Sequence, residues 1–216
     1  STAALRGRTI TLNTGRSEIS SAHVTERLTG QPLTELLVAS DVRARVERIL
    51  GEFGAEVVEY DAAAASVSGR SPSLNVNIHC DWLDQPAASG MAAYYWGLPV
   101  TGEPRSPIGQ RAAILMMKEL AARTDMANLG VHARTWDTLK LPGIPSVGID
   151  LGYLSNFHDA HRLADPVFRQ TLADSIVIAI QRLYLLEEED QPTGTLALDD
   201  VSRFNPMEDR RRVSGL

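Results

Sequence analysis

The sequence predicts a single α/β domain with a central, mostly parallel twisted sheet and helices on both faces. Short apolar runs with strand-like alternation occur between longer runs with helical spacing, which is the order typical of α/β sheets. The chain has 216 residues, 44% of them hydrophobic, so it can bury one substantial core but not two full ones. Because ligands of such sheets bind beyond the carboxyl ends of strands, we expect a functional site there.

In the first half of the chain, the sequence predicts three strands and one helix. The helix follows Thr34, a suitable N-cap, and its apolar residues recur at helical spacing until Gly54 ends it. Residues 17–30 are polar and are expected to form a loop. The strands are expected at residues 9–12, 55–60 and 74–79.

The second half continues the alternation and then changes character. We expect helices at residues 108–123 and 166–186, and a Pro/Gly-rich loop at 97–107. Residues 187–216 begin with acidic residues, continue to an arginine run and lack an apolar period, so we expect a partly disordered tail after a domain of residues 1–186. The further strands are expected at residues 90–96, 131–134 and 146–150.

Composition excludes several classes of function. A formal net charge of −6 and a pI near 5.4 leave no basic surface for nucleic acid. Cys80 is the single cysteine, which excludes a disulfide framework and a multi-cysteine zinc site. No apolar stretch reaches the roughly 18 residues that a membrane span needs. The chain starts without Met, and we therefore expect it to be a piece of a longer protein.

Three motifs stand at the ends of predicted strands. They are the nine residues 10–18 (ITLNTGRSE), residues 77–79 (NIH) and residues 145–156 (PSVGIDLGYLSN). Arg16, His79 and Asp150 each fall at a strand's carboxyl end, so these three residues should lie close together. In this order, the motifs resemble the zinc-dependent N-acetylmuramoyl-L-alanine amidases (amidase type 3) of bacterial cell-wall metabolism, over about residues 5 to 186.

The resemblance implies a role for four positions of this chain. Arg16 stands where the family has its first metal-binding histidine, and the resemblance implies that Glu35 is the glutamate ligand. His79 matches the second histidine, and Asp150 matches the catalytic glutamate. A guanidinium stays protonated and has no lone pair to donate, so Arg16 cannot replace an imidazole as a zinc ligand.

These departures argue against catalysis. A catalytic zinc needs three protein ligands and an open position for water, and only Glu35 and His79 remain of the three. Asp150 is shorter than glutamate by one methylene, and a misplacement of about 1 Å can cost on the order of 100-fold in rate. We therefore expect no cofactor; the alternative is an active enzyme that binds zinc through Glu35, His79 and a substitute ligand.

Several other readings of these residues remain open from sequence alone. Glu35 could be a solvated first-turn carboxylate favoured by the helix dipole, and His79 a hydrogen-bonded strand-end histidine. Arg16 could bridge Glu35 and Asp150 and so replace the positive charge of the metal. Substitute metal ligands are conceivable among three further histidines, His23, His158 and His161.

The residues around Trp136-Asp137, together with residues 150–153, 182–186 and 191–195, resemble the actinobacterial CwlM-type pseudo-amidase branch of that family. This resemblance implies a cytoplasmic regulator of peptidoglycan precursor synthesis. The implied partners are the enolpyruvyl transferase of the first committed step, serine/threonine kinase signalling proteins and peptidoglycan fragments. Thr193 and Thr195 are the implied phosphorylation sites, because a phosphate would add about −1.5 to −2 charge. The alternative is hydrolysis of the muramoyl-L-alanine bond by an active amidase.

Overall fold

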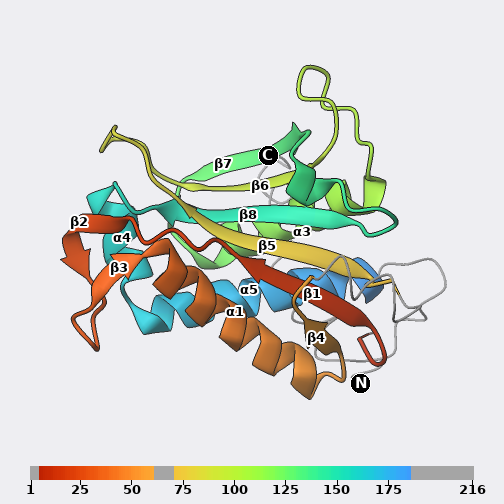
Figure 1. The fold of residues 1–216 in the computed structure, drawn as a ribbon, viewed down its shortest axis with the longest axis horizontal. Helices are drawn as coiled ribbons and strands as arrows, with labels where there is room; N and C mark the ends of the chain where they lie inside the picture. The colour runs from red at the N-terminus through yellow and green to blue at the C-terminus, as the bar shows by residue number, and fades with distance from the viewer. Residues whose placement is uncertain (1–4, 61–70, 186–216) are drawn as a thin grey trace, which may run out of the picture.

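A computed structural model describes residues 5–60 and 71–185. Its centre is a six-stranded sheet in the order β4-β1-β5-β8-β6-β7, accompanied by helices (Figure 1). The single α/β domain with a mostly parallel sheet that the sequence predicts is confirmed. The predicted tail, residues 187–216, and the positions Thr193 and Thr195 lie outside the described residues.

Most strands of the sheet run in the same direction. β1 (Thr9–Thr14) pairs in parallel with β4 (Glu56–Val58) on one side and with β5 (Leu74–Asp81) on the other. β5 in turn pairs in parallel with β8 (Ser146–Tyr153). The direction reverses at β6 (Met91–Trp96), which is antiparallel to β8 and parallel to β7 (Asn128–Arg134).

The helical cover of the sheet is unequal. The helices α1 (Glu35–Glu52), α5 (Pro166–Leu185) and α3 (Pro107–Arg123) lie side by side against one face, with α5 in the middle (Figure 1). The short helix α4 (Phe157–Leu163) follows β8. On the opposite face, the described chain has the single-turn 3₁₀ helix η2 (Asp137–Leu139), whose Leu139 side chain lies against Gly148 of β8.

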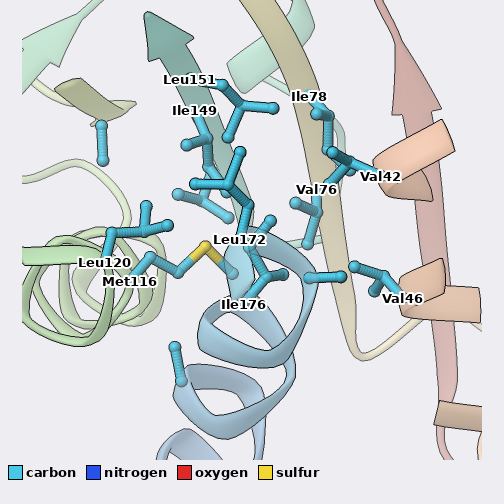
Figure 2. Packing of buried hydrophobic residues seen from close by; sticks show 14 of the residues in the cluster. Val42, Val46, Val76, Ile78, Met116, Leu120, Ile149, Leu151, Leu172 and Ile176 are labelled. Atoms are coloured by element: carbon cyan, nitrogen blue, oxygen red, sulfur yellow. The ribbon is translucent and has the colours of Figure 1, made fainter. Parts of the chain in front are cut away.

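The core lies between the sheet and the three long helices. Figure 2 shows side chains of α1, α3, α5, β5 and β8 meeting there. In β5, Leu74, Val76 and Ile78 point to this core and are fully buried, because every second residue of a strand lies on the same face. The remaining residues labelled in this cluster are Val42, Val46, Met116, Leu120, Ile149, Leu151, Leu172 and Ile176.

The other face of the same strands is polar. Thr11 Oγ1 and Asn13 Nδ2 both donate to Asn75 Oδ1 at 2.6 Å, and Asn77 Nδ2 donates to the Thr138 carbonyl oxygen of η2 at 3.1 Å. These hydrogen bonds offset the cost of burying amide groups. The alternation of apolar and polar residues in β5 therefore separates a core face from a face where polar chemistry can occur.

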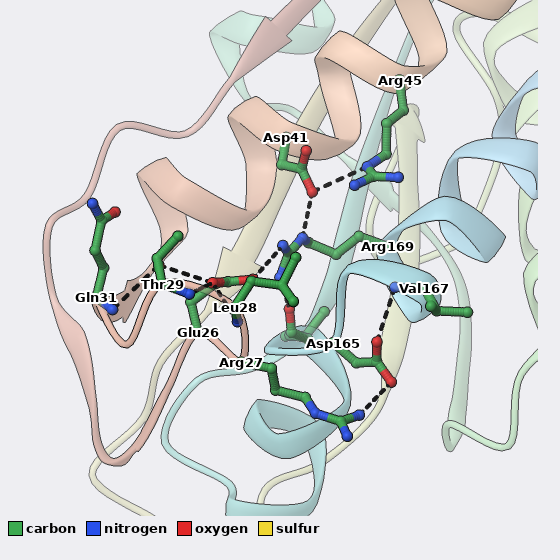
Figure 3. A network of polar contacts seen from close by, with 11 residues as sticks. Glu26, Arg27, Leu28, Thr29, Gln31, Asp41, Arg45, Asp165, Val167 and Arg169 are labelled. Carbon is green, nitrogen blue, oxygen red and sulfur yellow. Dashed lines mark hydrogen bonds and ion pairs between the residues drawn. The ribbon is translucent and has the colours of Figure 1, made fainter.

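The prediction of a loop at residues 17–30 is wrong in part. β2 (Ser20–Thr25) pairs in antiparallel fashion with β3 (Pro32–Thr34), so this polar segment is a small hairpin beside the main sheet. Its anchor is Glu26, which is buried and accepts a 2.9 Å ion-pair contact from Arg169 of α5 (Figure 3). A long-range ion pair of this kind leaves no periodic signal in the sequence.

Candidate functional site

The ends of β1, β5 and β8 come together at one edge of the sheet. Gly15 N–H, just after β1, donates to the Ile78 carbonyl oxygen of β5 at 2.8 Å. His79 of β5 lies directly opposite Asp150 of β8 in the strand register. The structure thus brings together three of the strand ends that the sequence marks, as expected for neighbouring parallel strands.

Glu35 enters this edge from the first turn of α1. Thr34 caps the helix, because its hydroxyl accepts the backbone N–H of Leu37 at 3.1 Å. The Glu35 side chain is only 11% exposed. Its Oε1 accepts the Ser17 N–H at 3.0 Å and its Oε2 accepts the Cys80 N–H at 3.1 Å. Glu35 therefore links the segment after β1 to β5, and it is not the solvated first-turn carboxylate that remained open from sequence.

Glu35 and His79 form a pair. His79 Nδ1 lies 3.6 Å from Glu35 Oε2. Contact with Glu35 raises the pKa of His79, although burial opposes the shift. Burial alone would raise the pKa of Glu35, but His79 and the two backbone N–H groups outweigh it and lower that pKa. The contact therefore favours the ionised carboxylate of Glu35 and the protonated imidazolium of His79.

Asp150 has a different environment. Burial raises its pKa to about 6, and the nearby charge of Asp81 acts in the same direction. A hydrogen bond with Tyr94 of β6 opposes this shift, as does the charge of His79. Asp150 is thus a carboxyl group that titrates close to neutral pH, which is a property common in functional sites.

Arg16 does not join this group. Its side chain is 76% exposed, and its ion pair is with Glu59 at 3.9 Å. The hypothesis that Arg16 bridges Glu35 and Asp150 is therefore wrong. The physical reason is that Glu35 is already satisfied by two backbone N–H groups and His79, while an exposed guanidinium keeps its hydration.

The three histidines that could have served as substitute ligands also lie apart from the site. His23 is exposed on β2, and His158 and His161 are exposed on α4. The His161 ring stacks on Phe157, with ring centroids 5.9 Å apart. In the part of the chain that the structure describes, no hydrogen bond or ion pair joins these histidines to Glu35, His79 or Asp150.

The side chains at the site do not fit a three-ligand zinc centre. Of the residues that the resemblance places at ligand positions, Glu35 and His79 meet, whereas Arg16 is exposed and pairs with Glu59. Within residues 5–60 and 71–185, no group of three or more His, Cys, Asp or Glu residues is arranged to hold a metal ion. The zinc content of the domain, and the assignment of Glu35 and His79 as former ligands, stay predictions.

Two contributors to the site were not identified from the sequence. Tyr94 lies on β6, which is antiparallel to β8, and forms a hydrogen bond with Asp150. The alternation of residues in β6 predicts which face of the sheet Tyr94 lies on, but not which residue it contacts. Gly15 leaves the space that the Glu35 carboxyl group occupies. The place of Gly15 in the turn after β1 marks a strand end, but it does not indicate that a carboxyl group packs against this residue.

The family model described as N-acetylmuramoyl-L-alanine amidase matches residues 12–182 of this chain. The chain is similar to the N-acetylmuramoyl-L-alanine amidase CwlM of Mycobacterium tuberculosis, with 31% identity over 206 residues, covering 91% of this chain and 50% of CwlM. It is 25% identical over 109 residues to the probable cell wall amidase LytH of Staphylococcus epidermidis, covering 50% of this chain and 34% of LytH. The chain thus spans half or less of the length of these two relatives.

Solved structures share the fold. The CwlD amidase from Clostridioides difficile, solved in complex with the GerS lipoprotein, has a TM-score of 0.67 and 19% identity, covering 84% of this chain and all of CwlD. The amidase Ami1 of Mycobacterium smegmatis has a TM-score of 0.63 and 23% identity, covering 85% of this chain and 99% of Ami1. In the described part of this chain, no helix is long and apolar enough to cross a membrane. With the match over residues 12–182, the chain belongs to the N-acetylmuramoyl-L-alanine amidase family.

Proposed function

We propose that this amidase-family domain is catalytically inactive and acts as a regulatory binding module in peptidoglycan precursor synthesis. The proposal is supported mainly by the residues that occupy the positions of the metal ligands and by the contacts that they make. Arg16 stands at the first histidine position and is directed toward Glu59. Both Glu35 carboxylate oxygens accept backbone N–H groups. A hydrolytic zinc would need three ligands and an open position, and this set provides two.

Asp150 supports the same conclusion, because its shorter side chain would also impair proton transfer. A general base must reach the proton that it takes, and one methylene less moves the carboxylate by about 1.5 Å, which is enough to lose most of the rate. The Asp150 carboxylate is already engaged by the Tyr94 hydroxyl. Loss of the third ligand and retraction of the base affect separate steps, so restoring one of them would not restore turnover.

The regulatory role draws on the similarity to CwlM. For this domain, the partners proposed are the enolpyruvyl transferase of precursor synthesis and serine/threonine kinase signalling proteins, in the cytoplasm. Thr193 and Thr195 are the proposed phosphorylation sites, because a phosphate adds charge and acceptor oxygens that an arginine cluster can bind. Changing both to Ala should abolish the effect of kinase treatment on partner binding. Unchanged binding of the transferase after phosphorylation of the parent would contradict this switch.

A second function has one observation in its favour. Glu35, His79 and Asp150 meet at one edge of the sheet, as they would in a domain that still cuts the bond between the lactyl group of muramic acid and L-alanine. This alternative requires a zinc ligand from elsewhere in the protein. It therefore predicts one tightly bound zinc per chain in the parent protein.

Elemental analysis of the purified protein, before and after incubation with zinc, separates the two functions. The sharp comparison is with Arg16→His, because Gly15 and Ser17 on either side of Arg16 are held against β5 and Glu35. We expect no zinc in the parent and one equivalent in Arg16→His. We further expect that neither the parent nor Arg16→His cleaves muropeptides, with release of L-alanine peptides as the readout. If any variant regains this activity, it should be the double variant Arg16→His/Asp150→Glu.

The controls and the contrary result are equally specific. Arg48→His changes an exposed arginine of α1 that pairs with Glu52, and it should add no zinc. One equivalent of zinc in the parent together with muropeptide cleavage would overturn the proposal and establish the enzyme. Failure of Arg16→His to bind zinc would show that the ligand geometry has been lost beyond the one substitution, and would strengthen the inactive assignment.

A further inference from the structure

Three side chains form a cluster on the face of the sheet that the long helices leave uncovered. Tyr94 of β6 and Trp136, just after β7, have ring centroids 4.7 Å apart at an interplanar angle of 48°. The Arg134 guanidinium lies 5.4 Å from the Tyr94 ring centroid and 5.7 Å from that of Trp136. Distances below about 6 Å are those of cation–π contacts. We call Tyr94, Arg134 and Trp136 the aromatic–arginine cluster.

The charge of Arg134 is not neutralised within the described part of the chain. Its Nη1 donates to the Ala133 carbonyl oxygen at 2.8 Å, and no ion pair there joins it to a carboxylate. Trp136 is 46% exposed, which is high for the largest apolar side chain. The cluster thus presents a solvent-exposed aromatic surface next to a guanidinium that forms no ion pair with the described residues.

The cluster is continuous with the functional site. Tyr94 lies opposite Gly148 in the register of β6 and β8, two residues from Asp150, and its hydroxyl interacts with the Asp150 carboxyl group. Gly148 has no side chain to separate them. A ligand that lies on Trp136 would therefore be close to both Arg134 and Tyr94, and Tyr94 links this cluster to Asp150.

We propose that the aromatic–arginine cluster binds a sugar ring that bears an anionic group, and that it does so without a metal ion. The apolar C–H face of a sugar suits an exposed indole. A carboxylate or phosphate on the sugar suits the fork of a guanidinium, and hydroxyl or acetamido N–H groups suit the Asp150 carboxylate as donors. An apolar peptide would cover the guanidinium of Arg134 without offering it an anionic partner, which is costly.

Two sources supply this ligand chemistry, a nucleotide-linked amino sugar and a fragment of the cell wall. The inference rests on the proposed function, because a domain that regulates precursor synthesis would respond to a small molecule of that synthesis. It differs from substrate binding by an amidase, because the residues named are on β6 and after β7 and no metal takes part. Binding can therefore be measured independently of cleavage.

The test is isothermal titration calorimetry of the full chain in EDTA. The probes are N-acetylmuramic acid, UDP-N-acetylglucosamine, UDP and the neutral sugar N-acetylglucosamine. We expect the two anionic sugars to bind at least about tenfold more tightly than N-acetylglucosamine. UDP-N-acetylglucosamine should also bind more tightly than UDP. The ratio of the two anionic sugars identifies the source: a tighter nucleotide sugar indicates the precursor, and tighter N-acetylmuramic acid indicates the wall fragment.

The variants are Trp136→Ala and Arg134→Gln, each expected to weaken binding of the anionic sugars by about tenfold or more. Phe157→Ala and Arg48→Ala are the matched controls, since both side chains are exposed on other elements, α4 and α1, and binding should be unchanged. Arg134→Gln should reduce the advantage over N-acetylglucosamine, whereas Trp136→Ala should weaken all sugars alike. Circular dichroism verifies folding; if Trp136→Ala unfolds, Trp136→Phe replaces it and should retain most of the affinity.

Three results would overturn the inference. They are no binding by any probe, equal affinity for charged and neutral sugars, and tighter binding of UDP than of the nucleotide sugar. Cleavage of muropeptides by the same sample, once zinc is added, would overturn the proposed inactive function but leave the sugar site standing. Absence of binding together with absence of cleavage would overturn the sugar site alone.

Discussion

A Cβ atom placed on Gly15 would lie 2.1 Å from the carboxyl carbon of Glu35. Heavy atoms cannot approach so closely, so the missing side chain of Gly15 is what lets Glu35 reach the Ser17 and Cys80 N–H groups. Glu35 can hold the ends of β1 and β5 together only because residue 15 is glycine.

The first prediction concerns this contact. Gly15→Ala should push the Glu35 carboxylate out of its place and lower the free energy of unfolding by about 1–3 kcal/mol, the usual cost of overpacking. Urea unfolding measures the difference. Gly51→Ala is the control, because a Cβ there meets nothing within 4 Å and helix propensity favours alanine. It should leave stability equal or raise it. Equal stability of Gly15→Ala and the parent would show that Glu35 is free to move.

The sequence was sufficient to predict the fold and the meeting of His79 with Asp150 at the strand ends, because both follow from local pattern. Period-two alternation in β5 fixes which side chains enter the core, and neighbouring parallel strands must end at one edge. The pattern could not reveal where Arg16 points, because Glu59 is 43 positions away. Nor could it reveal that Tyr94 contacts Asp150 or that Arg169 anchors Glu26, since these contacts form only when distant segments pack.

The second prediction concerns Arg16 itself. An exposed ion pair of 3.9 Å between Arg16 and Glu59 is worth little in water, because both groups stay hydrated. Arg16→Ala should therefore change the free energy of unfolding by less than about 0.5 kcal/mol. Chemical denaturation checks this. A loss of several times that size would mean that Arg16 stabilises the fold through more than this exposed ion pair.

The third prediction concerns the hairpin anchor. Arg169 contacts Glu26 at 2.9 Å and also pairs with Asp41 (Figure 3). It further donates to the Leu163 carbonyl oxygen. Arg169→Met would leave the Glu26 charge buried and unpaired, which should destabilise the fold by about 3–5 kcal/mol. Arg27→Met removes the exposed ion pair with Asp165 on the same hairpin and should cost less than about 1 kcal/mol.

Acid should reproduce the loss of this anchor. The Arg169 guanidinium and the N–H groups of Leu28 and Thr29 lower the pKa of Glu26 to about 2 from 4.5, although burial opposes them. A lowered pKa in the folded state gives stability that is present above pH 4.5 and is lost as the pH falls toward 2. Glu26→Gln should therefore flatten the dependence of unfolding temperature on pH in this window. If this pH dependence were unchanged in Glu26→Gln, other carboxylates would be the cause of the acid sensitivity.

The fourth prediction concerns Asp150, whose pKa burial raises to about 6 from 3.8. A raised pKa means that the folded chain holds this proton more tightly than the unfolded chain does. Its contribution to stability is full below about pH 4 and is lost as the pH rises through 6. The ionised carboxylate is then partly buried next to Asp81, and this destabilises the fold at neutral pH.

Asp150→Asn removes that ionisation and keeps an oxygen that can accept from Tyr94. We expect the variant to unfold at a higher temperature than the parent at pH 8 and to show no such advantage at pH 4, where the parent is protonated. Asp137→Asn is the control, because the Asp137 side chain is fully exposed on η2, and its unfolding temperature should follow that of the parent at both pH values. If Asp150→Asn were less stable than the parent at pH 8, the Asp150 charge would be stabilised by His79 more strongly than burial and Asp81 oppose it.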